Sequence, residues 1–181
     1  MDYTSLIFLI ISCTTINGLH AYLLISQRKE RKLTISDHAI STRNTQRVFI
    51  LGHFFGITCY ALFAYYFYSK HGHKGLFYLA LCVWVLDIIQ AVLPASGKTE
   101  KKHLLSAYGM GLLSLITTTM ATLILNQCPQ VRILSLILLG IIYIILAKTV
   151  FIRKKIYLDQ MIMIILLDTV LVLTLIATEY H

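Results

Sequence analysis

Ionisable side chains interrupt stretches of this sequence that are otherwise apolar. Asp87 lies within the run WVLDIIQAVL, while His53 and His103 lie in or beside neighbouring apolar runs. A charge in the middle of a membrane costs at least a few kcal/mol, so such a group normally faces protein and marks a functional site. A carboxylate and imidazoles can exchange protons or bind a metal ion such as zinc. We therefore predict an acid–base set, or metal ligands, at Asp87, His103 and His53.

A second set of polar side chains is predicted to line a cavity around these three residues. Cys13, Asn17 and His20 are spaced at i, i+4 and i+7, which places them on one stripe of a helix. Counted at about 1.5 Å per residue, the ionisable groups all fall in one half of the membrane, with His103 at its surface. The predicted cavity residues are His20, Asn17, Gln90, Ser106, Lys148 and Asp168.

The elements that must position these residues are membrane-spanning helices. Of the 181 residues, 57% are apolar and only 13% are charged, and the mean hydropathy is +0.75, which is typical of an integral membrane protein. Six apolar runs are long enough to cross a core of about 30 Å. They predict an all-α fold, a single bundle of six transmembrane helices at residues 5–26, 48–69, 76–96, 104–125, 133–152 and 158–180.

The basic residues predict the orientation of this bundle. The loops 27–47, 97–102 and 153–155 hold six, three and three Lys or Arg residues, twelve in all, whereas only Lys70, Lys74 and Arg132 lie on the other side. By the positive-inside rule, the basic loops are cytoplasmic and both termini lie outside. This distribution also explains the net charge of +8. Because no soluble module remains to carry a basic surface, we expect no nucleic-acid partner.

Membrane lipids are the expected partners of such a bundle. In addition, one helix face has small residues against which another helix can pack. Gly52 and Gly56 are four residues apart and would let another helix approach closely. We predict that this face contacts a neighbouring helix, with a membrane protein partner or a second copy of the chain as one possibility.

Short motifs in residues 34–110 resemble the Frag/DRAM-like membrane proteins and related prokaryotic families of uncharacterised function. The resemblance rests on ISDHAISTRNTQRVFILG before and into the second span, on Leu93 and Pro94, and on HLLSAY. It implies about six spans and, from the eukaryotic members, a link to lipid remodelling or membrane trafficking. Carried over position by position, the resemblance implies that the functional positions are Ser36, Asp37, Phe49, Pro94 and His103.

Four functions remain open at this stage. The leading one is a protein that binds or modifies a lipid in a polar cavity open to the cytoplasmic leaflet. The sequence does not decide whether such a protein is an enzyme. The alternatives are a non-catalytic scaffold or accessory subunit, a proton-coupled transporter that uses Asp87 and Asp168, and a b-type haem protein with His20 and His53 as axial ligands. The sequence requires no cofactor, and zinc and haem are the two to test.

Overall fold

The computed structural model describes residues 3–26, 35, 39, 42–93, 99–152 and 156–179. These residues form helices and no strand. The helices are α1 (Tyr3–Ser26), α3 (Arg43–Lys70), α4 (Lys74–Val92), α5 (Glu100–Leu125), α6 (Pro129–Ile152) and α7 (Ile156–Glu179). All six contain stretches that are long and apolar enough to cross a membrane. The predicted all-helical, six-span architecture is confirmed.

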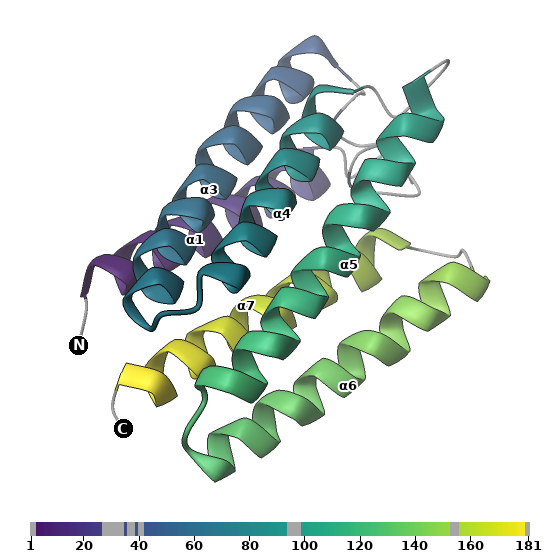
Figure 1. Cartoon of the computed structure of the whole chain (residues 1–181). Helices are drawn as coiled ribbons and strands as arrows, with labels where there is room; N and C mark the ends of the chain where they lie inside the picture. The colour runs from purple at the N-terminus through teal and green to yellow at the C-terminus, as the bar shows by residue number, and fades with distance from the viewer. Residues whose placement is uncertain are drawn as a thin grey trace.

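The helices run up and down, and helices that are consecutive in sequence mostly pack side by side (Figure 1). α3 packs between α1 and α4, and α5 packs on α4. α7 contacts α1, α5 and α6, while α6 lies at the edge of the bundle. Apolar and aromatic side chains of α3, such as Phe63, Phe67 and Tyr68, fill the largest buried cluster together with residues of α1, α4, α5 and α7. α3 is therefore the helix around which α1 and α4 are arranged.

Four helix ends differ from the predicted limits by four or five residues, and one of them is the start of α6, at Pro129 rather than residue 133. α3 begins five residues early, because Thr42 and Thr45 cap it reciprocally through their hydroxyl groups. α4 ends at Val92, since Leu93 precedes a proline and is extended. α5 begins at Glu100 rather than residue 104, which places His103 in its first turn.

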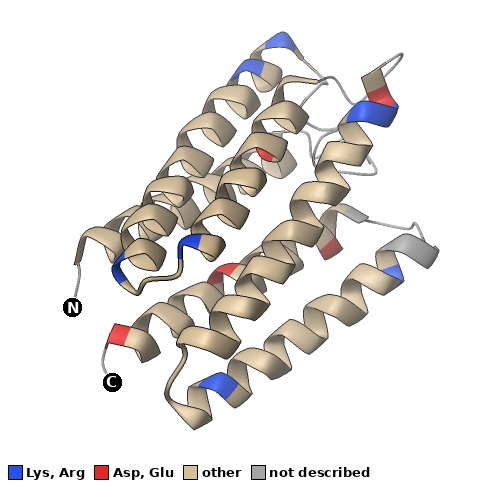
Figure 2. Cartoon of the chain, in the orientation of Figure 1, with Lys and Arg blue, Asp and Glu red and all other residues tan. Residues whose placement is uncertain are grey.

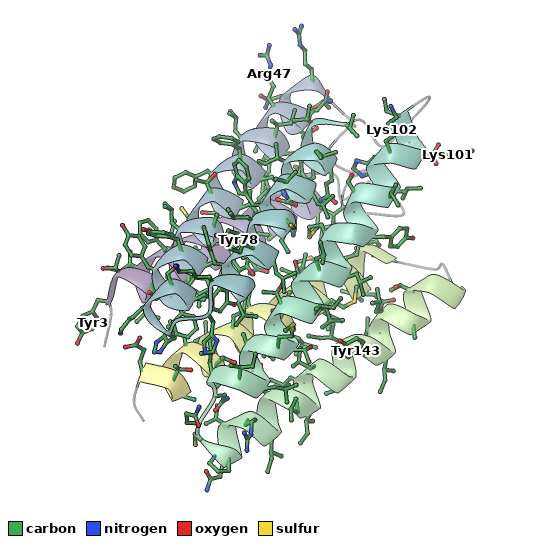
Figure 3. All side chains as sticks on the ribbon, in the orientation of Figure 1. Tyr3, Arg47, Tyr78, Lys101, Lys102 and Tyr143 are labelled. Carbon is green, nitrogen blue, oxygen red and sulfur yellow. The ribbon has the colours of Figure 1, made fainter. Side chains whose placement is uncertain are left out.

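Most Lys, Arg and Glu positions lie toward the two ends of the bundle, while some acidic positions lie within it (Figure 2). We call the end where α3 and α5 begin the basic end; it carries Arg43, Arg47, Lys101 and Lys102. Arg47 and Lys101 point away from the helices there (Figure 3). Both chain termini lie at the opposite end (Figure 1).

A carboxylate joins two helices at that opposite end. Glu179 accepts hydrogen bonds of 2.7 and 2.9 Å from Lys70 Nζ, and His71 Nε2 lies 3.2 Å from it. The Lys70 side chain is 44% exposed, so solvent weakens the pair. We expect Glu179→Gln to lower the free energy of unfolding by about 1 kcal/mol and to speed amide exchange in the last turn of α7. Unchanged exchange there would contradict this role for Glu179.

A buried chain of two histidines and an aspartate

Three buried side chains from three helices are joined in a line. His53 Nδ1 of α3 lies 2.9 Å from Asp87 Oδ2 and 3.1 Å from Asp87 Oδ1 of α4. On its other side, His53 Nε2 lies 3.2 Å from His20 Nε2 of α1. The three residues are only 3–4% exposed. We call His20, His53 and Asp87 the relay, because each hydrogen bond in the line joins groups that can exchange a proton.

Close packing of α1 on α3 makes the contact between the two imidazoles possible. A Cβ atom on Gly52 would lie 2.8 Å from Leu19 Cδ2, and one on Gly56 would lie 2.7 Å from Ile16 Cδ1. The glycines therefore allow an approach that a larger residue would prevent. Phe49, one turn before His53, packs its ring 4.2 Å from the imidazole, centroid to centroid. The close approach of α1 to α3 and the ring of Phe49 together fix the position of the His53 ring.

The predicted Gly52/Gly56 face is thus occupied within the chain. Leu19 and Ile16 of α1 fill the space in front of it. The neighbouring helix that the sequence predicts is α1, and a second copy of the chain could use this face only by displacing it.

Gln90 and His103 surround Asp87 in different ways. Gln90 Nε2 lies 3.4 Å from Asp87 Oδ1, one turn along α4. His103 Nδ1 lies 2.9 Å from the carbonyl oxygens of Gln90 and Leu93, so it donates to the last turn of α4. His103 is buried against protein at this end of the bundle, because the early start of α5 packs it against the end of α4. Asp87 is therefore paired with His53, whereas His103 caps the C-terminal end of α4.

A second polar pair lies one turn from the relay along α1. Asn17 Nδ2 donates to Asp168 Oδ2 of α7 at 2.6 Å and to the carbonyl oxygen of Cys13 at 2.9 Å. Asp168 is half-buried and lies near the middle of its helix. The predicted stripe of α1 therefore faces protein, with Asn17 turned to α7 and His20 turned to α3.

The two remaining predicted cavity residues, Ser106 and Lys148, form their hydrogen bonds with groups outside the relay. Ser106 donates to carbonyl oxygens of its own helix, those of Lys102 and His103, at 2.9 Å. Lys148 donates to Asp159 Oδ1 at 2.9 Å, close to the basic end. Asp159 is not among the predicted site residues, although an acidic residue in the first turn of the helix that follows Lys148 is a usable signal for such a pair.

The exposure of this ion pair limits its effect on stability. The Lys148 side chain is 49% exposed. We expect Lys148→Met to lower the free energy of unfolding by less than about 1 kcal/mol and to leave the nitrogen resonances of His20 and His53 unchanged in an NMR spectrum. A shift of those resonances would show that Lys148 acts on the relay.

Haem does not fit between the two histidines of the relay. An iron bound by both imidazoles needs two bonds of about 2 Å each, and the macrocycle must lie between the rings. Here the two Nε2 atoms are only 3.2 Å apart and hydrogen bonded. The hypothesis of a b-type haem with these axial ligands is not supported by this geometry.

Zinc lacks a ligand set in the part of the chain that the structure describes. No group of three His, Cys, Asp or Glu side chains there is arranged to hold a metal ion. Of the three predicted ligands, His53 and Asp87 bind each other, and His103 Nδ1 is used by backbone carbonyls.

The fold and the site together define the class of this protein. It is a multi-pass integral membrane protein with six candidate spans and a buried His–His–Asp line between α1, α3 and α4. Comparisons with protein family models, curated proteins and solved structures found no match. Of the residues indicated by the resemblance to the Frag/DRAM-like proteins, Phe49 and His103 adjoin this site, while Ser36, Asp37 and Pro94 lie outside the described residues.

Proposed function

We propose that this protein binds a membrane lipid in the cytoplasmic half of the bilayer and that the relay moves a proton to or from it. The observation that carries the proposal is the unbroken line from Asp87 through His53 to His20. A buried carboxylate that orients a histidine is a usual arrangement for proton transfer by an imidazole. The same groups would serve a lipid-binding protein without catalysis by holding a polar headgroup.

The surroundings of the relay favour a lipid as its ligand. Leu51, Phe54 and Phe55 flank His53 along α3 and are strongly exposed, as are Ile89 and Val92 near Asp87 on α4. In a bilayer these side chains contact acyl chains. A lipid lying against α3 and α4 would thus have its apolar part close to the relay. The resemblance to the Frag/DRAM-like proteins, some of which are linked to lipid remodelling, points the same way.

Retention of lipid by purified protein tests the proposal. The wild-type protein and Asp87→Asn would be released gently from membranes and weighed by native mass spectrometry. Glu179→Gln is the matched control, because it also alters a buried carboxylate with two partners but lies at the opposite end of the bundle. Thermal unfolding would establish that all three proteins are folded.

We expect the wild-type protein and the control to retain one lipid species in fixed proportion, and Asp87→Asn to retain at least about tenfold less, which corresponds to about 1.4 kcal/mol of binding free energy. A wild-type protein with no lipid in fixed proportion, or equal retention by a folded Asp87→Asn variant, would overturn the proposal. The relay would then be a polar contact that holds helices together, as in a scaffold.

Asp168 favours a proton-coupled carrier as the second candidate. It is a half-buried carboxylate near the middle of a span, and Asn17 is its neutral partner. Carboxylates in such positions take part in proton relays of transporters. Uptake of a solute into liposomes, driven by a pH gradient and abolished in Asp168→Asn, would favour this function over lipid binding.

A further inference from the structure

The relay ends on a nitrogen that has no partner. His20 Nδ1 is fully buried, and among the described residues no side chain or backbone group forms a hydrogen bond with it. The other three ring nitrogens of the two histidines are all engaged. Buried polar groups are normally hydrogen bonded, so an unpartnered one marks a place where something else binds.

The hydrogen bonds of the relay determine what His20 Nδ1 offers. His53 Nδ1 faces a carboxylate, so it carries a hydrogen and donates to Asp87. When His53 is neutral, its Nε2 is an acceptor, His20 Nε2 donates to it, and His20 Nδ1 is left as an acceptor. When His53 is an imidazolium, its Nε2 donates to His20 Nε2, and His20 Nδ1 then carries a hydrogen and is a donor. The addition of one proton to the relay therefore changes His20 Nδ1 from an acceptor to a donor.

We propose that His20 Nδ1 binds a hydroxyl group, either of a lipid headgroup or of a water molecule held beside it. A hydroxyl both donates and accepts, so it can pair with His20 Nδ1 in either protonation state of the relay. A metal cation would suit only the acceptor form, and a carboxylate or phosphate oxygen only the donor form. The inference rests on the proposed function, because the hydroxyl belongs to the lipid or accompanies it. It makes His20 the residue that touches the hydroxyl, and Asp87 then acts on the ligand through His53.

Proton transfer along this line is balanced. The hydroxyl gives its proton to His20 Nδ1, and the hydrogen on His20 Nε2 passes to His53 Nε2. The ligand has then lost one proton, and His53 has become an imidazolium held beside the Asp87 carboxylate. The reverse steps return the proton to the ligand. Asp87 keeps its charge throughout and orients His53.

Nitrogen NMR of the histidine rings tests this assignment directly. The full chain, labelled with ¹⁵N-histidine, would be placed in phosphatidylcholine nanodiscs. Diacylglycerol, which has a free hydroxyl, would then be added, and O-acetyl diacylglycerol, in which that hydroxyl is blocked, is its matched control. The variant H20Q assigns the His20 signals; should it fail to fold, the coupling across the hydrogen bond between the two Nε2 atoms assigns them instead.

Either of two results would support the proposal. A shift of the His20 Nδ1 resonance beyond its line width with diacylglycerol, and none with the acetylated lipid, identifies a lipid hydroxyl. A cross-peak between His20 Nδ1 and water in phosphatidylcholine alone, unchanged by diacylglycerol, identifies a bound water. The absence of both the shift and the cross-peak would overturn the proposal. A hydrogen on His20 Nδ1 while His53 is neutral would also overturn it.

The two proposals fail in different ways. A protein that retains a lipid through Asp87 but shows no ligand at His20 Nδ1 would keep the proposed function and lose the position of the ligand. A protein that retains no lipid but shows water at His20 Nδ1 would keep the bound hydroxyl and lose the proposed function. The lipid measurement and the NMR measurement therefore separate them.

Discussion

Gly56→Leu is expected to lower the free energy of unfolding by about 3 kcal/mol, the upper end for overpacking a buried contact. An added Cβ would already lie 2.7–2.8 Å from two carbon atoms of Ile16, and one of these, Cγ1, is not at the flexible end of that side chain. α1 must therefore move away from α3, which would lengthen the 3.2 Å contact between His20 and His53. The measurement is reversible unfolding in mixed micelles, with the coupling between the two Nε2 nitrogens as a second readout.

Gly140→Leu is the matched control for this substitution. Gly140 is exposed on α6, and a Cβ there would meet nothing within 4 Å. Leucine has a helix propensity better than that of glycine by about 0.8 kcal/mol, so the control should be neutral or slightly stabilising. Equal destabilisation by the two variants would show that close packing of α1 on α3 is not the cause.

Asp87→Leu is expected to destabilise the bundle by about 3 kcal/mol. It removes the acceptor of His53 Nδ1 and of Gln90 Nε2, and each buried donor left alone costs about 1–3 kcal/mol. Asp87→Asn keeps one acceptor oxygen in nearly the same place, so its cost should be about 1 kcal/mol. Unfolding of both variants in the same micelles checks this difference.

A double-mutant cycle assigns the effect to the His53–Asp87 contact. In a His53→Phe background, leucine at position 87 no longer leaves a histidine donor unpaired. Replacing both partners by apolar groups can be nearly neutral, so the second substitution should cost about 1–2 kcal/mol less than it does alone. Additive costs would mean that the two side chains do not interact in the folded protein.

Length and hydropathy were sufficient to predict the six spans, because a helix that crosses lipid must be apolar over most of its length. The helix limits were less accurate, since caps depend on single hydroxyl groups and on local backbone angles. The reciprocal cap of Thr42 and Thr45 lengthened α3, and the start of α5 at Glu100 moved His103 into the bundle. The second change lets His103 cap the end of α4, a contact that the sequence did not predict.

The candidate site was only partly predictable for a related reason. A helical period shows that Asn17 and His20 share a stripe, but it does not show which helix each one meets. The structure separates them, since Asn17 bonds to Asp168 and His20 to His53. Partner choice depends on the rotation and spacing of whole helices, and the glycines of α3 set that spacing for α1.

The polar stripe of α1 has a consequence for how this protein is made. Ribosomes produce about 5–20 residues per second, and 33 residues separate His20 from His53, whereas 151 separate Asn17 from Asp168. His20 can therefore find its partner within seconds, while Asn17 waits for the last helix of the bundle to be inserted. Until then the partly buried amide of Asn17 has no acceptor from α7, so this part of α1 completes its polar contacts only at the end of synthesis.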